Sequence, residues 1–330
     1  MGYAEGWAAL NMEMPKKVPR TEYSATNHWD LLTAVTGIDV GVDSDGETKG
    51  KAARAFMQAW DFSFLWSVMV GRGHLQSGRT TSMGHAEYAA GGVDFNTDVR
   101  CPFETPEDAL ALDPMEEYGP IDRGATTKAF EEHYARNCAG YPDAVNMSGV
   151  YITMFSGLID IFGWERLLLA GGMDPVGFGK LAQRYETWIT QFFEAFAESD
   201  VPVLMSHDDI VWTSGAVFRP EWYREYIFPA YERMWRPVLD AGKKIVYTSD
   251  GNYTEFLEDI VEAGAHSLVM EPTTDMAAFA EKYGQTHGFI GNADTRILLS
   301  GGKAEIRAEV ERCMAIGKDC PGFMMAVGNH

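Results

Sequence analysis

The sequence predicts an α/β fold, a single TIM (β/α)8 barrel domain over residues 1–330. The length suits this architecture, because α/β barrels run to about 250 residues and beyond as one domain. A hydrophobic content of 46%, including 18 Phe and 9 Trp, supplies a large core. In the second half, short apolar runs alternate with amphipathic stretches across short connections. This alternation is typical of parallel βα units.

Five strands and four helices are expected in the second half. Its apolar runs have the length of buried strands, and the stretches between them carry apolar residues at helical spacing, the first opened by Pro220. The predicted strands are residues 201–206, 243–249, 266–271, 287–292 and 321–328, and the predicted helices are residues 219–242, 253–264, 276–284 and 303–317.

Two further strands and one long helix are expected in the first half. The apolar runs 62–70 and 145–152 predict strands, and residues 175–197 predict an amphipathic helix with Trp188, Phe192 and Phe193 on its buried side. These runs bring the number of strands to seven, one fewer than an eightfold barrel needs. We expect the eighth strand near residues 155–162.

Two segments do not follow the strand and helix alternation. Residues 1–60 form an N-terminal extension in this interpretation. Residues 72–137 are polar, contain Gly and Pro, and are too long for an ordinary βα loop. We therefore expect an excursion over the barrel mouth there, with a short hairpin of its own.

Composition narrows the class of protein. A net charge of −21 argues against nucleic-acid binding, which needs clustered Lys and Arg. The sequence offers no membrane span, and its start lacks the basic-then-apolar order of a signal peptide, so a cytoplasmic location is expected. The four scattered cysteines predict reduced thiols. Phosphate-loop, dinucleotide, serine-hydrolase and HExxH motifs are missing.

Polar side chains follow the end of each predicted strand in the second half. Because the carboxyl ends of parallel strands meet at one edge of the sheet, these side chains should form one site. They are His207, Asp208, Asp209, Asp250, Asn252, Glu271, Asn292, Asp294, Asn329 and His330.

Some of these residues have a structural alternative. Asp250 or Asn252 could cap the following helix, and Asp294 could cap the helix after it. Glu271 precedes Pro272 at the end of an apolar run, where an unpaired carboxylate is costly, which favours a functional role. Alternation along the strand should place His207 and its second neighbour Asp209 on one side, with the residue between them on the other.

Two candidates come from the first half. Trp66 lies in the first predicted strand, and His85 lies in the excursion within TSMGHAEY, beside Glu87. Both could contact a substrate at the barrel mouth. The alternatives are a core position for Trp66 and simple solvation for the loop residues.

The motifs of the second half resemble those of a known superfamily. HDD, the helix RPEWYREYIFPAYERMWRPVLDAGKKI, SDGN, EP, GNADT and GFMMAVGNH occur in that order, after TMFSGLIDIFGWERLLLAGGMDPVGFGKLAQR. Over roughly residues 145–330, this order is similar to the uroporphyrinogen decarboxylase-like superfamily, which implies a TIM barrel. True uroporphyrinogen decarboxylases carry an RQAGRY-type segment, which this sequence lacks. Decarboxylation of a porphyrinogen is therefore not expected.

The resemblance points instead to the cobalamin-dependent methyltransferases of the superfamily. Relatives hold zinc through a His-x-Cys pair and a later Cys, where this sequence has Thr248, Asp250 and residues 327–329. A thiolate-rich zinc site is thus absent, and coenzyme M is a doubtful acceptor. Asp250, Glu271 and His207 could instead bind Zn²⁺ through O and N atoms, or the two acids could act in protonated form.

The resemblance therefore implies a methyltransferase that moves a methyl group from a small methoxy or methylamine-type substrate to cobalamin on a partner corrinoid protein. A decarboxylase with a smaller substrate and a non-catalytic ligand-binding barrel are the alternatives. A homodimer is also considered. The expected catalytic residues, which are also the candidate metal ligands, are His207, Asp250 and Glu271. The expected substrate-binding residues are Asp209, Asn292, Asn329, Trp66 and His85.

Overall fold

The computed structural model describes residues 2–23, 25–82 and 99–328. Two predicted substrate contacts, His85 and Asn329, lie outside these residues, as does part of the predicted excursion.

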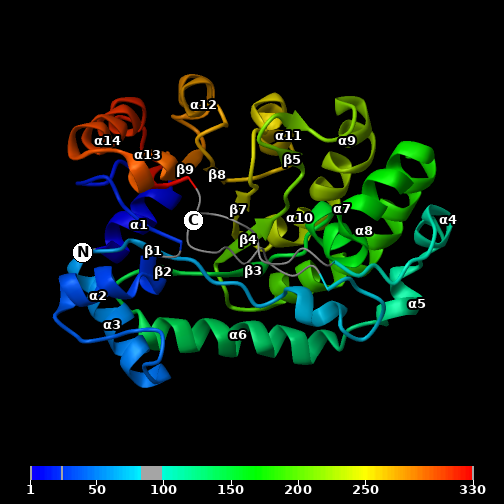
Figure 1. The fold of residues 1–330 in the computed structure, drawn as a ribbon, viewed down its shortest axis with the longest axis horizontal. Coiled ribbons are helices and arrows are strands. Elements are labelled where there is room, and N and C mark those ends of the chain that lie inside the picture. Colours follow the sequence, from blue (N-terminus) through cyan, green and yellow to red (C-terminus); the bar gives the residue numbers. More distant parts are fainter. Residues whose placement is uncertain (1, 24, 83–98, 329–330) are drawn as a thin grey trace.

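The central element is a six-stranded parallel sheet in the order β10-β9-β8-β7-β4-β3. The five strands expected in the second half are confirmed as members of this sheet, and nearly all of their residues are buried (Figure 1). A strand covered on both faces has few polar positions, which is why these strands read as continuous apolar runs. The strands are β3 Ser148–Val150, β4 Val203–His207, β7 Lys244–Thr248, β8 Ser267–Met270, β9 Gly288–Ala293 and β10 Phe323–Val327.

Both edges of the sheet are extended by shorter pairings. At the β3 edge, Val70 forms a parallel bridge with Val150, and β1 (Phe64–Leu65) pairs with β2 (Val145–Asn146). At the β10 edge, the Thr21 amide donates to the Met325 carbonyl at 3.1 Å. The Ser63 amide donates to the Arg20 carbonyl at 2.8 Å. Residues 19–21 thus lie between β10 and the segment leading into β1.

The prediction of an eighth strand near residues 155–162 is wrong, because these residues begin helix α7 (Phe155–Met173). Phe155, Leu158, Ile159 and Phe162 are all buried and recur at the i, i+3, i+4, i+7 spacing of a helix. The apolar content suggested a strand, whereas the period already indicated a helix.

Helices cover the outer side of the sheet (Figure 1). The long helix expected at residues 175–197 is confirmed as α8 (Pro175–Glu198), with Trp188, Phe192 and Phe193 buried. The single helix expected at residues 219–242 is instead divided into α9 (Pro220–Tyr226) and α10 (Phe228–Asp240). Pro229 lacks the amide hydrogen that would continue one helix through this point. The remaining α-helices of the second half are α11 Leu257–Glu262, α12 Met276–Tyr283, α13 Thr295–Ser300 and α14 Lys303–Gly317.

The N-terminal extension belongs to the core. Ala9 and Leu10 of α1 (Gly2–Leu10) pack in the same apolar cluster as Met205, Val246 and other strand residues that face away from the outer helices. A Cβ on Gly6 would lie 2.3 Å from the Ser63 carbonyl oxygen, so only glycine allows this approach. Helices α2 (Trp29–Thr36) and α3 (Gly46–Ala59) form a smaller cluster beside it.

The described part of the excursion is helical. It contains the short 3₁₀ helix Arg72–Leu75, α4 (Pro106–Leu110), α5 (Pro114–Tyr118) and α6 (Arg123–Gly140), and no hairpin appears among these described residues. Helix α6 packs against α8, so residues 123–137 belong to the helical layer. A hairpin occurs later in the chain, where β5 (Val211–Trp212) pairs with β6 (Gly215–Ala216) directly after β4.

Two expectations from composition can be compared with the structure. All four cysteines are free, as their spacing predicted. Across the three described ranges, no helix is long and apolar enough to cross a membrane.

Candidate active site

The ends of several strands surround a cavity of about 300 Å³. Its wall is mostly aromatic and aliphatic, from Tyr23, Trp66, Val68, Tyr151, Met205 and Val269. Its polar wall comes from residues that follow or end β4 and β7, including His207, Thr248 and Asp250. An apolar cavity with a few convergent polar groups is the usual form of a small-molecule site.

His207 and Asp209 form a pair at this cavity. His207 Nε2 lies 3.2 Å from Asp209 Oδ1, and His207 Nδ1 donates to the Tyr151 carbonyl at 3.0 Å. The imidazole is buried and stacks on the Tyr151 ring, with 3.7 Å between centroids and 9° between planes. Because Nδ1 faces a carbonyl and Nε2 faces a carboxylate, both nitrogens must carry a proton.

The electrostatics agree with a protonated His207. Burial lowers the pKa of the imidazole, but the charge and hydrogen bond of Asp209, the charge of Asp250 and the Tyr151 carbonyl together raise it to about 9. His207 is therefore an imidazolium at neutral pH, held against a carboxylate.

Asp208 points to the other side, as strand alternation predicts. Its carboxylate accepts hydrogen bonds from the backbone amides of Met154 and Ser156, at 3.1 and 2.7 Å, and from the hydroxyl of Tyr231. Complete burial raises its pKa to about 6 although these bonds lower it. Asp208 thus fastens the end of β4 to the start of α7 and is not a wall of the cavity.

The turn TSDGN after β7 divides its tasks between backbone and side chains. The Asp250 amide donates to Asp209 Oδ1 at 2.9 Å, and the Gly251 amide donates to Glu271 Oε2 at 2.7 Å. Asn252 Oδ1 accepts from the Thr254 amide at 3.1 Å, so the local capping bond is made by Asn252. The turn thereby fixes the carboxylates that follow β4 and β8.

Gly251 makes this arrangement possible. Its φ is +85°, in the region that favours glycine. A Cβ there would lie 2.7 Å from the carbonyl carbon and oxygen of Trp212 in the β5–β6 hairpin.

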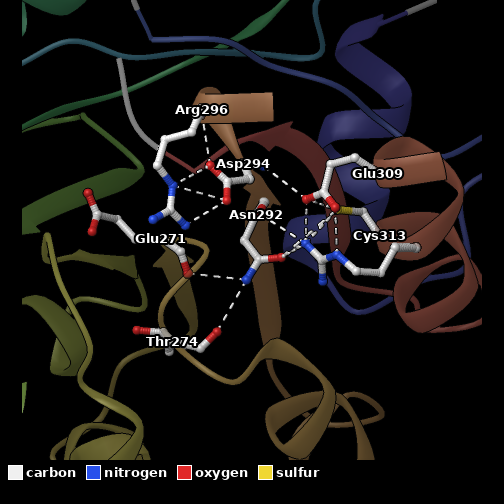
Figure 2. A network of polar contacts seen from close by, with 8 residues as sticks. Glu271, Thr274, Asn292, Asp294, Arg296, Glu309 and Cys313 are labelled. Atoms are coloured by element: carbon white, nitrogen blue, oxygen red, sulfur yellow. Dashed lines mark hydrogen bonds and ion pairs between the residues drawn. The ribbon is translucent and has the colours of Figure 1, made fainter. Parts of the chain in front are cut away.

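Asn292 lies in a network of polar contacts with Glu271, Thr274 and Cys313 nearby (Figure 2). Its Nδ2 donates to the carbonyls of Glu271 and Thr274, at 3.1 and 3.2 Å, and its Oδ1 accepts from Arg312 at 2.9 Å. The amide joins the ends of β8 and β9 to α14, and it is not among the described residues that line the cavity. This position does not support the predicted role of Asn292 in substrate binding.

Asp294 caps helix α13, which was the structural alternative to a role in the site. It accepts from the Arg296 amide at the start of α13 at 2.9 Å and forms an ion pair with the Arg296 guanidinium at 2.7 Å (Figure 2).

Trp66 lies in the cavity wall, as expected for a substrate contact. Its ring stacks on Tyr23, with centroids 4.7 Å apart, and its Nε1 is buried with no hydrogen-bond partner among the described residues. Thr248 is a wall residue that the sequence analysis did not assign to the substrate, and its Oγ1 is likewise buried with no partner in the described part of the chain. Both atoms could be satisfied by a bound polar group after a small movement.

Three other residues near the site were missed. Tyr23 belongs to no predicted element, and Tyr151 lies at the end of a predicted strand, which is the one signal that could have identified it. Asp160 lies within α7, and burial raises its pKa to about 6, while Arg72 and His207 lower it and Asp209 raises it. Only the path of α7 brings this carboxyl within the electrostatic influence of His207 and Asp209, so no sequence signal marks it.

A zinc ion bound by His207, Asp250 and Glu271 does not fit the described residues. His207 Nδ1 donates to the Tyr151 carbonyl, and Nε2 faces Asp209, which is not one of the three expected ligands. Within ranges 2–23, 25–82 and 99–328, no three His, Cys, Asp or Glu side chains form a group that could hold an ion. We assign no chemistry to zinc.

Comparison with known proteins identifies relatives of the second half. The uroporphyrinogen decarboxylase (URO-D) family matches residues 139–330. Uroporphyrinogen decarboxylase from Thermus thermophilus is 28% identical over 150 residues, which are 46% of this chain and 42% of that protein. The enzyme from Chromohalobacter salexigens is 24% identical over 161 residues, 47% of this chain and 44% of its own. The chain thus covers less than half of these relatives.

A solved structure matches nearly the whole chain. A methyltransferase from Methanosarcina mazei aligns with a TM-score of 0.62 over 99% of this chain and 92% of its own, at 16% identity. This likeness establishes the fold, an α/β architecture whose six-stranded parallel sheet matches TIM-barrel structures of the URO-D type.

Proposed function

Because the chain belongs to the uroporphyrinogen decarboxylase (URO-D) family, we propose that it is an enzyme of this superfamily on the methyltransferase side. It moves a methyl group from a small methoxy or methylamine-type donor to cobalamin on a partner corrinoid protein. The name of the structurally similar Methanosarcina protein supports this assignment.

The observation that carries the proposal is the His207–Asp209 pair at an aromatic cavity. Methyl transfer requires a dry space for the methyl-bearing group and stabilisation of the group that leaves. The apolar wall supplies the first requirement. The imidazolium supplies the second, because it can hydrogen-bond to a leaving oxygen and give it a proton.

The chain's own residues have separate tasks in this mechanism. Asp209 keeps the proton on His207 Nε2, and the Asp250 amide holds Asp209 in place. The Gly251 amide holds the carboxylate of Glu271 beside the turn that follows β7. A corrinoid in the Co(I) state, when presented by its carrier, supplies the nucleophile that accepts the methyl group.

Two structural predictions belong to the same proposal. Residues 19–21, hydrogen-bonded to Met325 on one side and to Ser63 on the other, serve as the segment that closes the barrel. The corrinoid protein docks at the strand ends that surround the cavity. A homodimer stays a prediction from the sequence analysis.

A decarboxylase is the second candidate, because the curated relatives are named uroporphyrinogen decarboxylases and an imidazolium can protonate a carbanion. Against it, His207 is the one basic side chain among the described residues that line the cavity. A substrate with many carboxylates needs several cationic partners.

The test is methylation of cob(I)alamin, followed by its absorption spectrum, with a panel of methoxy and methylammonium donors. With a methoxy donor, His207→Gln should lower kcat at least 100-fold, the range of general acid catalysis. His287→Gln is the matched control, because His287 lies at the opposite end of β9 and should leave kcat unchanged. Full activity of His207→Gln would remove the site assignment. If no donor gives methylcobalamin and a carboxylated substrate releases CO₂, the decarboxylase assignment replaces ours.

A further inference from the structure

The cavity has a wall of aromatic rings that belong to separate segments of the chain. Tyr23 and Trp66 stack with 27° between their planes, and Phe64 packs edge-on against Trp66 at 5.0 Å. Tyr151 lies in the same wall, with His207 stacked on it. Aromatic rings that surround a pocket attract cations through the negative faces of their π systems, and quaternary ammonium groups are commonly bound in this way.

The charges at the cavity favour a cation as well. His207 and Asp250 are the charged groups among the described lining residues, and Asp209 offsets the imidazolium from 3.2 Å. The sum of these three groups is negative by one charge. A cationic ligand is attracted by this balance, an anionic ligand is repelled, and a neutral ether gains nothing from it.

More distant carboxylates add to this balance. Burial raises the pKa of Tyr23, as do the charges of Tyr253, Asp250, Glu22 and Glu271, so these carboxylates act at the aromatic wall. Asp160 acts on Tyr151 in the same manner.

Three arginines offset these distant carboxylates in part. Burial raises the pKa values of Asp160 and Glu22, while the charges of Arg72 and Arg20, respectively, lower them. The pKa of Arg296 is raised mainly by its hydrogen bond to Asp294 and further by the charge of Glu271. None of these three arginines lines the cavity in the part of the chain that the structure describes.

We infer that the donor bound in this cavity is a methylated ammonium compound, with its cationic head against Tyr23, Trp66 and Tyr151. This inference rests on the proposed function and narrows it. A cavity of about 300 Å³ is large enough for a trimethylammonium head with a short tail. Thr248 Oγ1 and Trp66 Nε1 are buried in residues of the same wall, and after a small movement they can bind an oxygen on that tail.

The chemistry of this donor balances without a proton. The C–N bond breaks and its electron pair stays on nitrogen, while the methyl group passes to the electron pair that Co(I) provides. The positively charged donor leaves as a neutral amine. Because the product has lost the charge that the cavity attracts, its release is favoured. His207 then stabilises the site as a fixed part of the wall and gives no proton to this leaving group.

The test compares two ligands of the same shape by isothermal titration calorimetry on the full chain. Choline carries a trimethylammonium head, and 3,3-dimethylbutan-1-ol has the same shape without charge. Choline should bind at least tenfold more tightly, which corresponds to about 1.4 kcal/mol. Equal affinity, or no choline binding at millimolar concentration, would overturn the inference.

Two variants locate the binding. Trp66→Leu and Asp250→Asn should each reduce the preference for choline at least fivefold. Trp29→Leu and Asp30→Asn are the controls, since both residues belong to α2 and neither lines the cavity. Asp250→Asn is a polar change after β7, so it keeps the test valid if Trp66→Leu destabilises the core. An unchanged preference in a folded Asp250→Asn variant would place the binding elsewhere and refute the inference.

The cob(I)alamin assay separates this inference from the proposed function. Methylcobalamin formed from methoxy donors, without a choline preference, would keep the function and refute the cationic donor. A strong choline preference with no methyl transfer to cob(I)alamin from any donor would keep the ligand class and refute the function.

Discussion

Replacing Asp209 by Asn should remove the positive charge of His207. In the wild type, Asp209 accepts a hydrogen bond from the Asp250 backbone amide at 2.9 Å and faces His207 Nε2 at 3.2 Å. The side chain of Asn keeps an oxygen that can accept the first bond, but it has no negative charge to place beside His207. Burial then dominates the imidazole and lowers its pKa. We expect His207 in Asp209→Asn to be neutral at pH 7.

The magnitude follows from the raised pKa. The pKa of His207, about 9, lies above the ordinary histidine value of 6.5. At 1.36 kcal/mol per pKa unit, this difference corresponds to about 3 kcal/mol of stability. Since the folded-state pKa is raised, this stability is fully present below pH 6.5 and is lost as the pH rises through 9. The wild type should therefore exceed Asp209→Asn by about 3 kcal/mol at pH 6, and the gap should narrow above pH 9.

The assay is urea unfolding at pH 6, 7.5 and 9.5, together with NMR titration of the His207 ring. Asp294→Asn serves as the control, because Asn can retain the cap and this residue does not line the cavity. A gap that stays constant across the three pH values would refute this reasoning. A wild-type His207 that titrates at or below pH 6.5 would do the same.

Three other substitutions test individual contacts. Gly251→Ala should lower the free energy of unfolding by about 2 kcal/mol, because Gly251 has a φ of +85° and the added Cβ would contact the Trp212 carbonyl. It should also lower kcat more than the control Gly37→Ala, because Gly37 has a φ of +70° but open space around it. Asn292→Ala should cost about 2–4 kcal/mol in thermal or urea unfolding, because it removes the three hydrogen bonds of the side-chain amide to the Glu271 carbonyl, the Thr274 carbonyl and Arg312. A loss below about 0.5 kcal/mol would contradict this structural role. Thr21→Val removes the 2.7 Å bond to the Phe64 carbonyl and should cost about 1–2 kcal/mol, whereas exposed Thr286→Val should be neutral by the same measurement.

The second half of the fold could be predicted because each strand is covered on both faces and therefore reads as an apolar run. The segment 19–21 could not be predicted in the same way. It is short, contains Pro19 and Arg20, and acquires its position only from hydrogen bonds to Met325 and Ser63. The strand expected at residues 155–162 failed for the opposite reason, because apolar content was weighed above helical spacing.

The site was predictable to the extent that it depends on strand ends. Alternation along β4 brings His207 and Asp209 together, and the end of β8 places Glu271 beside the next turn. The division of tasks within the turn could not be predicted, since the contacts of its backbone amides depend on the positive φ of Gly251. The side chain of Asn292 also lies at a strand end, but it binds Arg312 of α14 and so has a structural role.

The charge of His207 and the attraction of the cavity for cations have a common origin in the carboxylates. Asp209 and Asp250 keep a buried imidazole protonated, although burial alone would make it neutral. The same two carboxylates exceed that single positive charge, so the site has a fixed cation and a remaining negative potential. Replacing Asp209 by Asn removes one negative charge and, with it, the proton of His207, so the sum of the three groups stays negative by one charge. A methoxy donor would respond to the loss of the proton, whereas an ammonium donor would keep its affinity. The effect of Asp209→Asn on affinity and on kcat can thus separate the two donor classes.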